Sequence, residues 1–277
     1  PVLLVNARLS AKSAKGYAKL GQLVKEGLQS LTAIAAQTKE DAERLESLGA
    51  QNVSVACNMK FDVMPPDDVL AHGKNLRATL GANKRPVFLA ASTRSHEGVQ
   101  EEALILDAVA QANIPDLLTI IVPRHPQRFD EVAQLLQNRG CHFVRRSTLD
   151  KNSKTASTAF VLGDSMGEMF SYYAACDVAF IGGSLLPLGG QNLIEACAVG
   201  KPVLIGPHTF NFEQASKYAI EHGAAIRVQD STDLASALKK LFSEPAQLEN
   251  MANAALKFAK ENKGAAERIA ALIKLFV

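Results

Sequence analysis

Short runs of wholly apolar residues recur along this chain, and they alternate with longer segments that have helical periodicity. The run at residues 86–91, PVFLAA, contains no polar side chain. Such strands are typical of a parallel sheet covered by helices on both faces, because a strand with one face in water alternates apolar and polar residues. The pattern therefore predicts an α/β fold built on a parallel sheet.

The same periodicity places the elements along the chain. We expect strands at residues 2–5, 32–37, 53–56, 86–91, 117–122, 142–145, 159–162, 178–181, 202–205 and 224–228. We expect helices at residues 12–29, 38–49, 99–112, 192–199, 231–242, 244–262 and 265–276, and two more that end near residues 139 and 175.

Polar clusters follow five of the predicted strands, at residues 6–10, 92–94, 124–125, 164–168 and 182–192. In parallel α/β sheets, ligands bind outside the carboxyl ends of the strands. These clusters therefore predict one functional face.

The most suggestive cluster lies in residues 182–212, where two glycine pairs, at 182–183 and 189–190, flank a short loop before the predicted helix 192–199. Glycines allow backbone N–H groups to approach a ligand closely, and a helix amino terminus attracts anions. Glu195 lies one turn after Asn192, where a carboxylate could accept both hydroxyls of a ribose. The stretch indicates a phosphate cradle, although a loop that only packs a helix on the sheet remains an alternative.

Other motifs narrow the chemistry. Arg124 lies in a proline-stiffened turn that suits a phosphate, and Glu168 stands where a further helix begins. Residues 163–167, GDSMG, match the G-x-S-x-G elbow of hydrolases. However, Asp177 precedes its strand and Asp230 has no histidine after it, so the acid and base of a triad are missing. Neither a G-x-G-x-x-G motif nor a P-loop occurs in the sequence.

The composition excludes several other classes. A formal net charge of +2 with scattered basic residues does not indicate nucleic-acid binding. The four cysteines and six histidines have no metal-ligand spacing, so we expect reduced thiols, a cytosolic chain and no bound metal. No apolar run approaches the roughly 20 residues that span a bilayer.

Several long motifs together resemble the 3-deoxy-D-manno-octulosonic acid (Kdo) transferases of lipopolysaccharide synthesis. They are PRHPQRF at residues 123–129, GDSMGEM at 163–169, GGSLLPLGGQNLIEA at 182–196 and GPHTFNF at 206–212. NARLSAKSAKGYAKL at residues 6–20 and NMKFD at 58–62 are similar to the later part of the same enzymes' first domain.

The resemblance implies a GT-B glycosyltransferase with two Rossmann-like domains, of which the second binds CMP-Kdo. We expect the later part of the acceptor domain at residues 1–64, a linker at 65–84 and the complete donor domain at 85–277. The resemblance also implies an inverting transfer, without metal or other cofactor, to a lipid A precursor at the cytoplasmic face of the inner membrane.

Matching the motifs position by position gives the expected site. The implied nucleotide contacts are Pro123, Arg124, Met166, Gly167, Glu168, Asn192, Leu193, Ile194 and Glu195. Possible contacts to the donor sugar or phosphate are Ser92, Thr93, Gly183, Ser184, Gln191 and Asn211.

Two departures from the family qualify these expectations. Gln191 stands where the family usually has a histidine, which also forms hydrogen bonds. The family's first domain begins well upstream of Pro1, with a hydrophobic anchor and a glutamate proposed as the general base. We therefore expect a soluble, amino-terminally truncated, donor-binding piece that is inactive alone, contains no catalytic residue, and would reach membrane and acceptor only through the missing part.

Three alternatives remain at this point: a UDP-sugar transferase, a sugar epimerase of the same fold, or a non-catalytic nucleotide-binding module. We also expect residues 1–62 to leave a sheet edge exposed.

Overall fold

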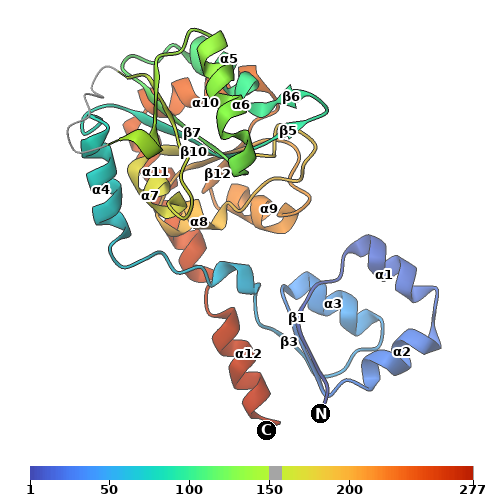
Figure 1. Ribbon diagram of the computed structural model, residues 1–277. Coiled ribbons are helices and arrows are strands. Elements are labelled where there is room, and N and C mark those ends of the chain that lie inside the picture. Colours follow the sequence, from blue (N-terminus) through green and yellow to red (C-terminus); the bar gives the residue numbers. More distant parts are fainter. Residues whose placement is uncertain (150–157, 277) are drawn as a thin grey trace. The chain divides into compact units, whose positions relative to one another are not determined.

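The computed structural model describes residues 1–149 and 158–276 (Figure 1). The chain divides into two compact units. The first comprises Pro1–Val63 together with Ala259–Val277, and the second comprises Met64–Phe258. Each unit is described by itself below.

The first unit is built on a three-stranded parallel sheet of order β1-β2-β3. Its elements are β1 (Leu3–Ala7), α1 (Ala11–Ala18), α2 (Gln22–Gln29), β2 (Ala33–Ala36), α3 (Lys39–Ser47), β3 (Val53–Val55) and α12 (Ala265–Lys274). Strand β1 lies at one edge, and Val2 and Leu4 there are 61% and 39% exposed. Strand β1 is therefore an edge strand flanked by exposed apolar side chains.

The single helix expected at residues 12–29 is wrong in detail, because α1 and α2 are separate. Gly21 lies between them with a φ of +51°, a conformation that other L-residues seldom adopt and that ends a right-handed helix. The glycine therefore makes a turn between two helices.

The carboxy-terminal helix α12 belongs to the first unit, although we expected it in the donor domain. The carboxylate of Asp62 accepts hydrogen bonds from the N–H groups of Gly264, Ala265 and Ala266, at 2.6, 3.2 and 2.6 Å. An anionic acceptor at a helix amino terminus satisfies free N–H groups and the helix dipole. Ile269 packs into a small core with Ala35 of β2, so this helix is both capped and packed by the first unit.

The second unit contains a seven-stranded parallel sheet of order β12-β11-β10-β4-β7-β9-β8. Its strands are β4 (Val87–Thr93), β7 (Leu118–Pro123), β8 (Phe143–Arg145), β9 (Phe160–Leu162), β10 (Val178–Ile181), β11 (Val203–Ile205) and β12 (Ala225–Arg227). The chain starts at β4, extends the sheet on one side and then returns to β10 on the other. This reversal creates a topological switch point at the carboxyl ends of β4 and β10.

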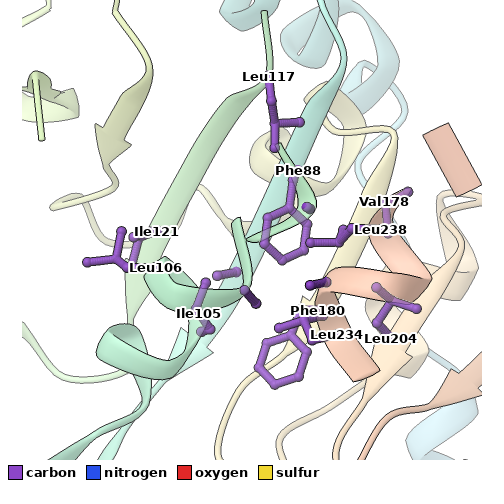
Figure 2. Close-up of a cluster of buried hydrophobic side chains, with 14 of the residues drawn as sticks. Phe88, Ile105, Leu106, Leu117, Ile121, Val178, Phe180, Leu204, Leu234 and Leu238 are labelled. Atoms are coloured by element: carbon purple, nitrogen blue, oxygen red, sulfur yellow. The ribbon is translucent and has the colours of Figure 1, made fainter. Parts of the chain in front are cut away.

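Helices cover both faces of this sheet. They are α4 (Val69–Thr79), α5 (Glu101–Ala112), α6 (Phe129–Asn138), α7 (Met169–Ala175), α8 (Ile194–Ala198), α9 (Glu213–Glu221), α10 (Ser231–Ser243) and α11 (Pro245–Glu261). On one face, Phe88 and Phe180 of the sheet pack with Ile105 of α5 and Leu234 and Leu238 of α10 (Figure 2). These side chains are fully buried, as the apolar strand pattern predicted.

The other helical layer includes a close α4–α7 contact that sequence patterns did not anticipate. A Cβ at Gly73 of α4 would collide with Ala174 of α7. Arg77 of α4 pairs with Asp177 at 2.6 Å, and Asp177 also accepts the N–H of Val87 at 2.8 Å. The stretch at 65–84, expected to be a linker, therefore contains a helix packed into the second unit. Asp177 lies at the amino edge of the sheet, as predicted.

One further element differs from expectation. A small antiparallel hairpin of β5 (Ser95–His96) and β6 (Val99–Gln100) precedes α5, which begins at Glu101 rather than at residue 99. In the part of the chain that the structure describes, no helix has the length and apolar content needed to cross a membrane.

Candidate functional site

The carboxyl ends of four adjacent strands gather most of the predicted polar clusters on one edge of the second unit. Strands β10, β4, β7 and β9 are neighbours, and they lead into residues 182–192, 92–94, 124–125 and 164–168, respectively. The prediction that these clusters share one edge of the sheet is confirmed for these four. The fifth, residues 6–10, belongs to the first unit.

Two arginines flank the switch point. Arg124 follows β7 and is exposed. Its backbone N–H donates to the carbonyl of Thr93 at 3.0 Å. Arg94 follows β4 and is half-buried. Burial, and then the charges of Arg94, Arg124 and Arg128, lower the pKa of His125. Within residues 1–149 and 158–276, neither Arg94 nor Arg124 has a carboxylate in a salt bridge, so this edge offers positive charge to an anion.

Glu195 of α8 lies within reach of the charge of Arg124. Burial raises the pKa of its carboxyl, while the Asn192 side chain and the charge of Arg124 act in the opposite direction. Asn192 donates from Nδ2 to Oε1 of Glu195 at 3.0 Å and accepts the Ile194 N–H at 3.0 Å. Arg124 and Glu195, two of the predicted site residues, thus interact through their charges.

Leu193 and Ile194, which we expected to contact the nucleotide, expose little of their side chains. The side chains of Leu193 and Ile194 are buried, and the Ile194 N–H is used by Asn192. The helix α8 that follows has only five residues. Contacts from this segment to a ligand are therefore left to the Asn192 and Glu195 side chains and to backbone atoms.

The glycine loop differs from the predicted phosphate cradle. The N–H groups of Gly183, Ser184 and Leu185 donate to the buried carboxylate of Glu101, at 2.6, 3.1 and 3.0 Å. These donors are consumed inside the protein, so they are not free for a phosphate. Gly182 serves close packing instead, because a Cβ there would collide with the carbonyl oxygen of Ser92.

Two hydroxyls expected near the donor are internal. Ser184 is fully buried, donates to the carbonyl of Ile181 and accepts the N–H of Gly206. Thr93 is also fully buried and donates to Glu102 at 2.5 Å. Neither side chain faces a ligand in this arrangement, because both stabilise the ends of the strands.

The remaining possible donor contacts lie closer to the surface. Ser92 is half-buried, with a φ of +56° that is unusual for a residue with a side chain. The Nε2 atom of half-buried Gln191 lies 3.3 Å from where a Cβ on Gly183 would be. Asn211 is exposed and donates from Nδ2 to the carbonyl of Leu188 at 3.0 Å. These side chains remain candidates.

The turn after β9 carries Met166, Gly167 and Glu168. Met166 is 66% exposed and Gly167 has a φ of +79°. Glu168 pairs with Arg146 at 2.7 Å. The pair lies on the wall of a cavity of about 390 Å³, which is lined by His72, Asn75, Leu76, Thr79, Arg146, Leu149, Glu168 and Ser171. The carboxylate of Glu168 therefore faces this cavity, while the exposed backbone of Met166 and Gly167 is free to contact a ligand.

The same turn contains Ser165, the serine of the G-x-S-x-G match, and its surroundings argue against a hydrolase. The Ser165 hydroxyl shares a hydrogen bond of 2.5 Å with the hydroxyl of Tyr172. Burial raises the pKa of Tyr172 above its ordinary range, so this phenol is no base for a nucleophile.

Sequence reasoning missed two residues of this edge. Arg94 was included in a polar cluster but not among the candidate contacts, although its place directly after a buried strand is the same signal that identified Arg124. Glu101 looks like an ordinary carboxylate in the first turn of a helix, and nothing local indicates that it reaches a loop 82 residues later.

Comparisons with known proteins agree with this geometry. Residues 1–63 match the family model described as 3-deoxy-D-manno-octulosonic-acid transferase (kdotransferase). Residues 102–258 match that of glycosyl transferases group 1. A 3-deoxy-D-manno-octulosonic acid transferase of Bordetella pertussis is 44% identical over 273 residues, which are 97% of this chain and 62% of the relative.

Solved structures extend the likeness to the fold. The C-terminal CMP-Kdo binding domain of WaaA from Acinetobacter baumannii aligns with a TM-score of 0.62 and 35% identity, covering 69% of this chain and 97% of that domain. Anabaena Alr3699/HepE in complex with UDP aligns with a TM-score of 0.59 and 18% identity, covering 99% and 72%. The second likeness concerns the fold alone. The predicted GT-B glycosyltransferase fold is confirmed.

The chain spans less than two thirds of the curated relatives it matches. It covers 62% of the Bordetella protein. It also covers 64% of a 3-deoxy-D-manno-octulosonic acid transferase of Haemophilus influenzae, which is 36% identical over 280 residues, or all of this chain.

Proposed function

The chain belongs to the family of 3-deoxy-D-manno-octulosonic acid (Kdo) transferases, and from this premise we propose that its second unit binds CMP-Kdo as the donor of a sugar transfer. The observation that carries the proposal is the alignment with the Acinetobacter CMP-Kdo binding domain, which extends over 97% of that domain. The edge that carries Arg124 and Glu195 supplies the chemistry that a nucleoside monophosphate needs.

Each part of the donor has a matching group. The guanidinium of Arg124 neutralises the phosphate of CMP, which becomes more negative as the bond to the sugar breaks. The carboxylate of Glu195 accepts the hydroxyls of the ribose, and Asn192 holds that carboxylate in place at 3.0 Å. The turn at Met166 and Gly167 contacts the nucleoside, and Pro123 fixes the start of the arginine turn.

Arg124 is also supported by its surroundings. Its backbone N–H donates to the carbonyl of Thr93, and this hydrogen bond holds the turn at the end of β4. Arg94 adds a second positive charge at that end, and both lower the pKa of His125. A lowered pKa favours the neutral form of the His125 imidazole, which leaves the two arginines as the positive charges of this edge.

In the whole enzyme, we place this unit in an inverting, metal-independent transfer of Kdo to a lipid A precursor at the cytoplasmic face of the inner membrane. An inverting transfer needs a base that takes the acceptor's proton. This chain binds the donor and stabilises the leaving CMP. None of the residues named above acts as the base that takes the acceptor's proton.

The experiment is a calorimetric titration of the 277-residue chain with CMP and with UMP. We expect CMP to bind more tightly than UMP. Arg124→Ala should weaken CMP binding by about 10- to 150-fold, the equivalent of one charge-assisted contact of roughly 1.5–3 kcal/mol. Equal affinity for the two nucleotides would refute the donor assignment.

A matched control removes an equivalent charge elsewhere. Arg139 pairs with Asp107 on the surface at 2.6 Å, and its side chain is 45% exposed. Arg139→Ala should leave the dissociation constant for CMP unchanged. A similar loss of affinity in both variants would mean that net charge, rather than a contact from Arg124, governs binding.

A second assay addresses the division of labour. The chain is mixed with CMP-Kdo and a lipid A precursor, and the lipid product is followed by mass spectrometry. We expect donor binding without product. Product formation by the chain alone would contradict the assignment of binding only.

A further inference from the structure

The buried carboxylate of Glu101 joins two strand ends of the second unit. Glu101 is the first residue of α5 and is 0% exposed. Its Oε1 accepts the N–H groups of Ser184 and Leu185, at 3.1 and 3.0 Å. Its Oε2 accepts those of Gly183 and Arg94, at 2.6 and 3.2 Å. One side chain thus holds the start of the glycine loop after β10 and the residue that follows β4.

This arrangement requires the ionised form of the side chain. A carboxylate has about four acceptor positions, and all of them are used by N–H donors here. A proton on either oxygen would turn an acceptor into a donor that faces an N–H group, so a bond to the loop would be lost. Few side chains can replace it, because an amide offers only one oxygen.

The loop held by Glu101 touches the groups proposed to bind the donor. A Cβ on Gly183 would lie 3.3 Å from the Arg94 Cδ and 3.3 Å from the Gln191 Nε2, so both side chains pack against this glycine. The carbonyl of Gly183 accepts the N–H of Gly190 at 2.8 Å. The position of Gly183 therefore influences the position of Gly190 and of the loop that ends at Asn192.

The segments packed around Glu101 bring few charged or titratable groups close to it. Glu102 lies on the same turn of α5 and is paired with Arg128 at 2.7 Å. Arg94 follows β4, and His208 follows β11, where its N–H donates to the carbonyl of Ser184 at 3.0 Å. Residues 183–185 carry no ionisable side chain. The residues of α10 that are buried in the interface with α5 are apolar.

Burial is the largest influence on this group, and it raises the pKa of Glu101 to about 7. The N–H donors of Gly183, Leu185 and Arg94 oppose the rise, and the charge of Glu102 adds to it. The loop contacts are thus made and lost within the range of neutral pH.

We propose that Glu101 is a positioning residue of the donor site: its ionised carboxylate holds Gly183–Leu185 and Arg94 together, and CMP binds to the chain in that ionised state. This inference rests on the proposed function. It adds a residue that touches no ligand and acts through the glycine loop.

The opposite signs of two pH effects separate positioning from mere stability. Because the folded state raises the pKa above its ordinary value, the contribution of Glu101 to stability is fully present below about 4.5 and is lost as the pH rises through about 7. The affinity for CMP should change in the other direction and rise with pH. A side chain that only supported the fold would move both quantities together.

The first measurement uses the ligand-free chain. The amide signals of Arg94, Gly183, Ser184 and Leu185 are followed by NMR as the pH is varied. We expect the four signals to titrate with one common midpoint near 7. Independent or absent titration would overturn the role of Glu101, and this test needs no variant that must fold.

The second measurement compares CMP affinity in wild type and Glu101→Gln at about pH 6 and about pH 8. The fraction of ionised Glu101 sets the competent population, so wild-type affinity should fall about tenfold at the lower pH relative to the variant's own change. The variant corrects for the titration of the CMP phosphate and of His125. Identical pH profiles would overturn the positioning role.

The matched control is Glu102→Gln. Its carboxylate is equally buried on the same turn but binds Thr93 and Arg128 rather than the loop. This variant should keep the rise of CMP affinity with pH, with a midpoint below that of wild type, because the charge of Glu102 adds to the rise in the pKa of Glu101. If CMP does not bind any variant while the four amides still titrate together, the proposed function and the donor part of this inference fail, and the loop-holding contact stands.

Discussion

Replacing Glu195 with alanine tests the ribose contact. Asn192 donates to Oε1 of Glu195 at 3.0 Å, and within the described part of the chain Oε2 is left open for a ligand hydroxyl. A hydrogen bond to a charged group contributes roughly 1.5–3 kcal/mol, which corresponds to about 10- to 150-fold in affinity. Glu195→Ala should therefore weaken CMP binding by that factor.

The assay compares two ligands in two proteins. CMP and 2′,3′-dideoxy-CMP are titrated into wild type and Glu195→Ala by calorimetry. Wild type should prefer CMP by the factor above, and the variant should bind both ligands nearly equally, because the hydroxyls have lost their acceptor. A variant that keeps the wild-type preference for CMP would refute the ribose contact.

A control carboxylate lies on the next helix. Glu221 of α9 pairs with Lys217 at 3.8 Å and is 51% exposed. Glu221→Ala should retain both the affinity and the preference for CMP. Thermal unfolding of each variant checks that the fold is intact.

The remaining predictions concern stability and metal. Arg128→Met should lower the free energy of unfolding in urea by about 3–5 kcal/mol, because it leaves the fully buried Glu102 without its cationic partner. Arg139→Met, at an exposed pair, should lower it by less than about 1 kcal/mol. Equal losses in the two variants would contradict this. Asp62→Ala should destabilise the first unit by about 0.5–2 kcal/mol and speed hydrogen exchange of the first α12 amides; unchanged exchange would argue against the cap. EDTA should leave the dissociation constant for CMP unchanged, and a loss of affinity would show that a metal takes part.

The elements and the functional edge were predictable from the sequence because their signals are local. An unbroken apolar run identifies a buried strand, and the polar residue after it falls at the carboxyl end. Arg124 follows such a strand directly, and Glu195 lies one helical turn from Asn192. Both residues could therefore be placed on the same edge before the structure was known.

The contacts that prepare the edge were not predictable because they join distant parts of the chain. Glycine spacing suggested free N–H groups, yet Glu101 accepts them from 82 to 84 residues away. Asp62 similarly caps a helix that begins about 200 residues later. In both cases, a carboxylate satisfies backbone donors that a local pattern leaves unassigned.

A crystal structure of the chain with CMP tests the central claim most directly. The account predicts phosphate oxygens within about 3 Å of the Arg124 guanidinium, ribose hydroxyls on the Glu195 carboxylate and the nucleoside against the Met166–Gly167 turn. CMP bound elsewhere, such as in the cavity that Arg146 and Glu168 line, would contradict it.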